Sequence, residues 1–114
     1  MENKNLSAFN MQKFNVGGKR VMKIWILEKN TDEQWFEPKI FQMAESAEDS
    51  AKKDIKSVIE KYFGTEEKCS EYCFNIKHGV GTAAIRDRGG SYWDWRITEH
   101  SLEIIGENYE NQHQ

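Results

Sequence analysis

The sequence has few of the residues that form disulfide frameworks, chain breaks or membrane spans. Its 114 residues include one proline and two cysteines, Cys69 and Cys73, and its longest apolar run is Ile24–Leu27. That run is far shorter than the roughly 20 apolar residues of a membrane-spanning helix, so we expect no membrane span. The two cysteines do not make a disulfide framework, and the N-terminus shows no charged and then apolar leader. These absences favour a cytoplasmic protein in a reducing compartment.

An excess of charge of one sign is also lacking. The net charge of −3 is too small to indicate a general nucleic-acid binder. The charges are nevertheless uneven, because residues 1–23 carry five basic residues against Glu2 alone, whereas residues 99–110 carry four glutamates and no Lys or Arg. We expect a flexible basic arm over residues 1–20, a single α+β domain over residues 21–105 and a polar tail over residues 106–114.

The first half of the domain has the composition of a β-hairpin. β-branched and aromatic residues predict a strand over residues 21–27, and polar residues predict a turn over residues 29–33. Residues 34–43 are the expected returning strand. Pro38 has no N–H to donate, so this strand should lie at a sheet edge or contain a bulge.

The clearest periodic pattern predicts a long helix. Apolar residues recur at steps of three and four from Ala47 to Phe63, with lysines on the other side. Ser46 with Asp49 is the expected N-terminal cap, and Gly64 is placed to end the helix.

Residues 65–78 fit two patterns. Cys69, Tyr72, Cys73 and Ile76 are spaced as one helical stripe, whereas Tyr72, Phe74 and Ile76 alternate as in a strand. The helical pattern has more members, so we expect a second short helix that ends at Gly79.

The last third of the chain predicts a second hairpin. Residues 82–87 and 92–97 read as strands around the Gly-rich turn 88–91, and the second strand can extend through Leu102 and Ile104. The expected fold is therefore α+β, with an antiparallel sheet of about four strands from two hairpins. One long helix and a second short helix would pack on one face, in the order β-β-α-(α)-β-β.

The strongest candidate site is the segment Tyr92–Arg96. In a strand, Trp93 and Trp95 share one face, while Tyr92, Asp94 and Arg96 share the other. We expect the two tryptophans in the core, with exposed indoles as the alternative. Tyr and Arg are enriched in binding hot spots, and the neighbouring strand and turn supply further arginines. The predicted binding residues are Arg86, Arg88, Tyr92, Asp94 and Arg96.

Catalytic, metal and cofactor motifs are not evident. Cys69 and Cys73 could bind zinc only together with His78 and His100, and their spacing is not that of a zinc motif, so buried inert thiols are the preferred interpretation. Gly79–Thr82 lacks the strand before it and the third glycine of a dinucleotide-binding loop, and is expected to be a cap and turn. We therefore expect no catalytic residues, no metal and no cofactor.

The expected function is that of a small non-enzymatic protein-binding module that acts as an inhibitor or accessory factor. Its general style resembles small proteins encoded by phages and mobile elements. A protein partner is expected, and a homodimer through the same sheet is a companion expectation. The alternative is a single-stranded nucleic-acid or nucleotide binder that uses the same residues. A small-molecule enzyme is the second alternative.

Overall fold

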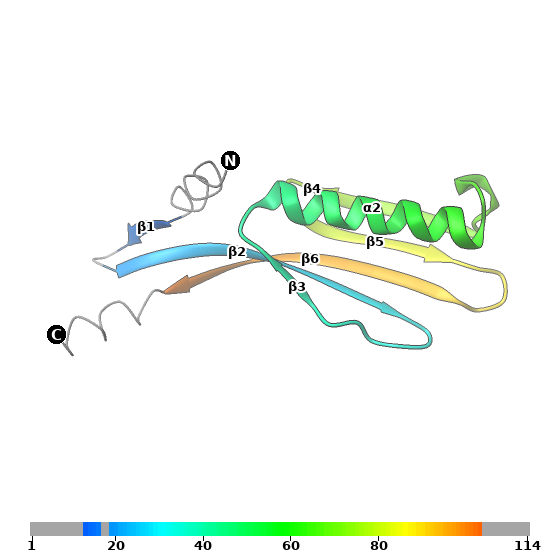
Figure 1. Ribbon diagram of the computed structural model, residues 1–114, viewed down its shortest axis with the longest axis horizontal. Coiled ribbons are helices and arrows are strands. Elements are labelled where there is room, and N and C mark those ends of the chain that lie inside the picture. The colour runs from blue at the N-terminus through cyan, green and yellow to red at the C-terminus, as the bar shows by residue number, and fades with distance from the viewer. Residues whose placement is uncertain (1–12, 17–18, 104–114) are drawn as a thin grey trace.

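One long helix lies along one face of an antiparallel sheet in the computed structural model, which describes residues 13–16 and 19–103 (Figure 1). The elements, in chain order, are β1 (Lys13–Val16), β2 (Lys19–Thr31), β3 (Lys39–Phe41), α2 (Ala44–Tyr62), the 3-10 turn η1 (Glu66–Lys68), β4 (Glu71–Lys77), β5 (Val80–Arg86) and β6 (Tyr92–Glu103). The expected α+β class with an antiparallel sheet and one long helix is confirmed.

The sheet has more strands than the expected four. Its order is β1-β2-β6-β5-β4, and β3 also pairs with β2. β2 and β6 are the longest strands and pair along most of their length, from Val21 opposite Glu103 to Thr31 opposite Trp93. The returning strand of the first hairpin is shorter than the expected residues 34–43. It is β3, which pairs with β2 over Lys39–Phe41. Pro38 immediately precedes β3, which agrees with the expected edge position.

The expected second helix is wrong. Residues 65–78 instead contain η1 and the strand β4, so the alternation of Tyr72, Phe74 and Ile76 is the pattern that the structure follows. The reason lies in the turn that follows, because His78 and Gly79 both have positive φ, at 56° and 77°. Two such residues form the tight turn that joins antiparallel strands, and here they link β4 to β5. Gly79 therefore belongs to a hairpin turn and does not cap a helix.

The long helix begins earlier than expected. Met43 is the N-cap and the helix starts at Ala44, so Ser46 lies inside the first turn and makes no capping bond. The expected Ser46 cap is wrong because tertiary packing fixes the start: Ala44 rests against Gly79, where an added Cβ would lie 2.5 Å from the Ala44 Cβ. The predicted apolar stripe is confirmed, and its buried members are Ala47, Ala51, Ile55, Val58 and Ile59.

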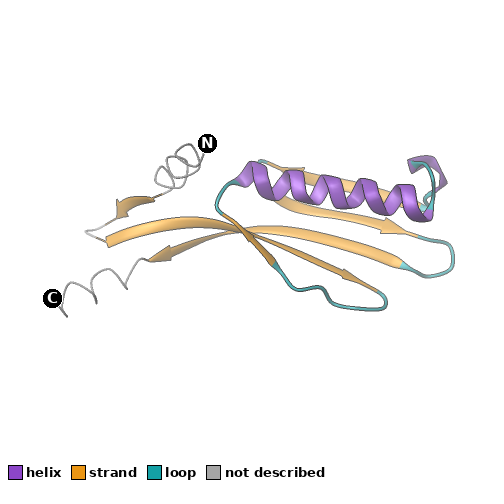
Figure 2. Ribbon diagram, in the orientation of Figure 1, coloured by secondary structure: helices purple, strands orange, loops and turns teal. Residues whose placement is uncertain are grey.

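Figure 2 shows α2 lying along one face of the sheet. The core lies between the buried stripe of α2 and this face. Trp93 and Trp95 both belong to it, and Trp95 is only 1% exposed. Trp25, Leu27, Ile85 and Ile97 are buried beside them. The preferred interpretation of the two tryptophans as core residues is thereby confirmed, and the alternate residues Tyr92, Asp94 and Arg96 must face the other side of the sheet.

The expected arm and tail fall only partly within the described residues. Residues 1–12 and 104–114 lie outside them, and so does the whole of the expected tail. Within the expected arm, β1 pairs with the start of β2, and the expected domain boundary at residue 21 falls inside β2. No helix within residues 13–16 and 19–103 combines the length and the apolar character needed to cross a bilayer.

Candidate functional site

The side of the sheet that α2 does not cover carries most of the predicted binding residues. We call this side the open face. It consists of the even-numbered residues of β2, β5 and β6, the odd-numbered residues of β4, and Ile40 of β3. Arg86, Tyr92, Asp94 and Arg96 all belong to it. The register places Arg86 directly opposite Tyr92, and Asp94 follows on the same strand.

Two ion pairs, Arg86–Asp94 and Arg96–Glu28, together with Tyr92 form what we call the polar part of the open face. Arg86 makes the most contacts within it. Its Nη1 atom lies 3.0 Å from Asp94 Oδ1 and 3.1 Å from the carbonyl oxygen of Ile85. Its guanidinium also lies over the Tyr92 ring, 5.3 Å from the ring centroid. The Arg86 and Asp94 side chains are 41% and 38% exposed, so the ion pair adds at most about 1 kcal/mol to stability. Its main effect is to help hold the guanidinium over the Tyr92 ring.

A second ion pair extends the polar part of the open face from β6 to β2. Arg96 Nε lies 3.6 Å from Glu28 Oε1, between residues that stand directly opposite each other on β6 and β2. Both side chains are exposed, and Arg96 is the more exposed of the two. Positive and negative groups therefore alternate on this face, which disfavours a purely anionic ligand.

Arg88 is the predicted residue that the strands do not place on the open face. It lies in the exposed turn between β5 and β6, where Asp87 Oδ1 accepts a hydrogen bond from the Gly89 N–H at 3.3 Å. The turn is also held by the Asp87 N–H, which donates to the Ser91 carbonyl at 2.9 Å. The structure thus brings four of the five predicted residues together and leaves Arg88 at the end of the hairpin.

Trp35 also lies beside the residues of the open face. The sequence predicts only that it belongs to the returning strand of the first hairpin. It forms an isolated bridge with Asn30 and is 81% exposed. It lines a shallow pocket of about 370 Å³ together with Arg86 and Arg96. The loop that carries it is ordered by Thr31, whose Oγ1 accepts the Glu33 and Gln34 N–H groups at 3.1 Å.

The sequence contains a signal that Trp35 faces away from the core, and this signal is the neighbouring Phe36. Adjacent residues of an extended segment point to opposite faces, so Trp35 and Phe36 cannot both enter the core. Phe36 is the one that turns to the helix side, where Lys29 Nζ lies 4.6 Å from its ring centroid. Trp35 is therefore directed to the open face.

A second part of the open face is aliphatic. Met22 pairs with Leu102 near the end of β6, and Ile26 pairs with Ile40 farther along β2, so large aliphatic side chains stand opposite each other at both places. Ile40 and Leu102 are exposed, whereas Ile24 is only 7% exposed. The open face thus combines an aliphatic part with a polar part that holds Trp35, Tyr92 and the arginines.

Among the described residues, the cysteines and histidines do not form a metal centre. Cys69 is half-buried, and burial followed by the nearby Glu66 charge raises the pKa of its thiol, which disfavours the thiolate at neutral pH. Cys73 is exposed on β4, which corrects the expectation that both thiols are buried on a helical stripe. Over residues 13–16 and 19–103, no group of three His, Cys, Asp or Glu side chains is arranged to hold a metal ion.

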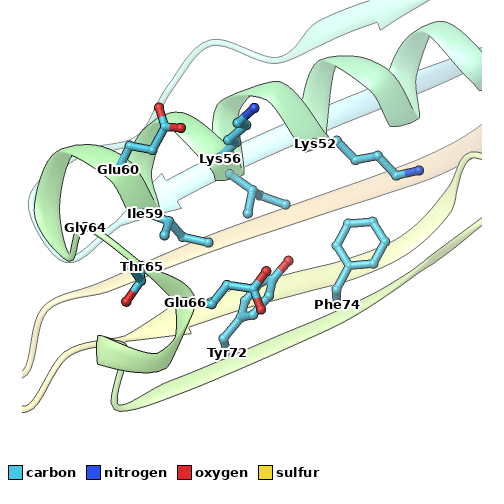
Figure 3. Close-up of a pocket in the computed structure, with 10 residues that line it drawn as sticks. Lys52, Lys56, Ile59, Glu60, Gly64, Thr65, Glu66, Tyr72 and Phe74 are labelled. Atoms are coloured by element: carbon cyan, nitrogen blue, oxygen red, sulfur yellow. The ribbon is translucent and has the colours of Figure 1, made fainter.

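A second concave region lies on the helix side, between the C-terminal half of α2 and β4 (Figure 3). Its volume is about 510 Å³, and Ile55, Ile59, Tyr72 and Phe74 form its apolar lining. Lysines and glutamates surround this lining, and Lys52 Nζ lies 5.9 Å from the Phe74 ring centroid. Burial, together with the Glu66 charge, raises the pKa of Tyr72. We call this region the α2–β4 groove.

No protein-family model, no curated protein and no solved structure matches the chain. Functional assignment therefore depends on the geometry of these two surfaces. The open face is the chemically more varied of them, because it carries Trp35, Tyr92 and two ion pairs.

Proposed function

We propose that the chain is a small non-enzymatic binding module that holds a protein partner against its open face and acts as an inhibitor or accessory factor. The observation that carries the proposal is Trp35, which is 81% exposed beside the Arg86–Asp94 and Arg96–Glu28 ion pairs. Trp, Tyr and Arg are the residue types that contribute most to protein interfaces when they are desolvated. Here all three types stand on one side of one sheet.

The aliphatic part of the open face supports the same proposal. Ile40 and Leu102 are exposed on this side, and contiguous exposed apolar surface on a small protein marks an interaction site. The polar part carries both charge signs, so the partner should present apolar groups beside a mixture of acidic and basic residues. A free and exposed Cys73 on the same side favours a reducing compartment for the interaction.

Quantitative affinity capture tests the proposal. The immobilised chain is compared with a Trp35→Ala/Arg96→Ala variant, and Lys53→Ala on the exposed side of α2 serves as the control that also removes one positive charge. We expect a partner that the wild type and Lys53→Ala retain and that the double variant loses. Equal recovery by all three proteins would contradict a role for the open face.

A single-stranded nucleic acid is the second candidate ligand. The observation that favours it is the stacked pair of Arg86 and Tyr92 beside the exposed indole of Trp35, since bases stack on such groups. Glu28 and Asp94 weigh against it because they stand beside the arginines. Quenching of tryptophan fluorescence by an oligonucleotide at low salt, reversed by added salt, would support this candidate. No quenching at low salt would eliminate it.

A further inference from the structure

β4 forms one edge of the sheet, and its outer side faces no other strand of the described chain. Its seven residues contain no proline and pair with β5 throughout, from Glu71 opposite Arg86 to Lys77 opposite Val80. A two-residue hairpin closes on a hydrogen-bonded pair, here Lys77 and Val80. The antiparallel pattern then turns the backbone N–H and C=O groups of Tyr72, Phe74 and Ile76 away from β5 and toward the free edge.

The sequence of β4 is complementary to itself. When a second copy of the strand runs antiparallel to the first with Phe74 opposite Phe74, Glu71 stands opposite Lys77 at both ends. Tyr72 then stands opposite Ile76, and these are the residues whose backbone groups face outward. This register uses all seven residues, whereas a shift by two residues leaves one end of each strand without an opposite residue.

The α2–β4 groove provides an independent reason for a second copy at this edge. Tyr72 and Phe74 on β4 form one side of the groove and are only partly covered by α2 (Figure 3). A partner strand in the Phe74-centred register would place its Ile76 beside Tyr72 and its Phe74 beside Phe74, on the helix side of an extended sheet. Apolar surface that the single chain leaves half-exposed would then become part of a continuous core layer.

We propose that the chain forms a two-fold symmetric homodimer through antiparallel pairing of β4 with β4 of a second copy, centred on Phe74. Edge-strand pairing supplies backbone hydrogen bonds, and the two Glu71–Lys77 pairs fix the direction and register of the strands. The open face remains uncovered in this arrangement. The proposal is therefore independent of the function proposed above, and the dimer would carry two open faces on the same side of one sheet.

Charge reversal tests the register. Glu71 and Lys77 are both exposed, so Glu71→Lys and Lys77→Glu should leave the fold intact, as checked by circular dichroism and thermal unfolding. Each single variant places like charges opposite each other at two symmetric positions, and we expect the dimer dissociation constant to rise about tenfold in sedimentation equilibrium. The double variant Glu71→Lys/Lys77→Glu exchanges the charges and should recover the wild-type constant.

A cross-link tests the same register without relying on charge. Cys73 stands opposite residue 75 of the second copy, at a non-hydrogen-bonded pair whose Cα atoms lie at roughly 4.5 Å, within disulfide range. Asn75→Cys should therefore give a covalent dimer under mild oxidation. Within one chain, residues 73 and 75 are about 7 Å apart and do not bridge. The wild type and Lys77→Cys, which lack an opposed cysteine pair, are the controls.

Several outcomes would overturn the proposal. One is a monomer for the wild type at all concentrations without a cross-link in Asn75→Cys. Another is a dimer that neither charge reversal weakens, which would seat the second copy elsewhere, such as on the open face. Cross-linking of Lys77→Cys as readily as Asn75→Cys would exclude the Phe74-centred register.

Discussion

Trp95 donates a hydrogen bond from its indole Nε1 to Asp54 Oδ2 of α2, over 2.8 Å. The same carboxylate oxygen lies 2.8 Å from Lys29 Nζ of β2, so one side chain of the helix binds two neighbouring strands. Lys29 and Trp95 stand opposite each other in the sheet, and Lys29 Nζ lies 5.8 Å from the indole centroid. This arrangement fixes how α2 sits over the sheet, and hence which sheet face stays open.

Asp54→Ala should destabilise the protein, because it leaves the indole N–H of a core tryptophan without an acceptor. We expect a loss of about 1–3 kcal/mol in the free energy of unfolding, measured by urea titration followed through tryptophan fluorescence. Asp54→Asn keeps an acceptor oxygen and should lose less. Equal losses in both variants would show that the charge of Asp54, and not its hydrogen bond to Trp95, accounts for the effect.

Gly79→Ala should be among the most destabilising single-methyl substitutions in the chain. The residue has a φ of +77°, and a Cβ there would lie 2.5 Å from the Ala44 Cβ and 2.8 Å from Ala44 backbone atoms. Backbone strain and the clash together should cost about 2–4 kcal/mol. Gly64→Ala is the matched control, since Gly64 has a φ of +89° but nothing within 4 Å of an added Cβ. A loss for Gly79→Ala no larger than that of the control would contradict the close packing of α2 against this turn.

The acid dependence of stability should include a contribution from Glu48. Its carboxylate accepts the Gly79 N–H at 2.9 Å and lies 3.1 Å from Lys52 Nζ, and these contacts, the Gly79 bond first, hold its pKa below the ordinary value of 4.5. The unfolded chain therefore binds the proton more readily than the folded one. The stabilisation should be complete above pH 4.5 and be lost as the pH falls through the lowered pKa.

The measurement compares the wild type with Glu48→Gln by urea titration. We expect the wild type to be more stable at about pH 7, and the difference to shrink as the pH falls below 4.5 and through the lowered pKa of Glu48, because both side chains are then neutral. A difference that stays constant with pH would mean that the Glu48 charge does not contribute to stability.

Binding and stability should separate for two exposed arginines, Arg96 on the open face and Arg88 in the adjoining β5–β6 turn. Arg88→Ala and Arg96→Ala alter exposed side chains, so each should change the free energy of unfolding by less than about 0.5 kcal/mol. Their combination should nevertheless abolish partner capture. Thermal unfolding and capture assays on the same preparations check the two effects, and unchanged capture would remove these arginines from the proposed contact surface.

The elements that the sequence predicts well are those with one dominant local pattern. The stripe from Ala47 to Ile59 has helical spacing throughout, and the β5–β6 hairpin has a Gly-rich turn between alternating strands, including the extension of β6 through Leu102. Both patterns reflect side chains that face one core. Tertiary packing only confirms what the local periodicity already requires.

The predictions that failed concern features that depend on backbone angles or long-range contacts, which local periodicity does not include. In β4 the helical and strand patterns overlap, and the choice depends on the His78–Gly79 turn, whose positive φ values a stripe count does not include. The start of α2 depends on contact between Ala44 and Gly79, which are far apart in sequence. For the site, alternation along β6 places Tyr92, Asp94 and Arg96 on one side, but Trp35 joins them only through its bridge to Asn30.

The position of β6 in the sheet has a consequence for the order of folding. β6 is the last described strand in the chain, yet it lies between β2 and β5 and carries Trp93, Trp95 and Ile97 into the core. During synthesis, the N-terminal strands and α2 emerge without the strand that joins them to the β4–β5 hairpin. The nascent chain can therefore complete the burial of its apolar helix stripe only after β6 has left the ribosome, and aggregation competes with folding during that interval.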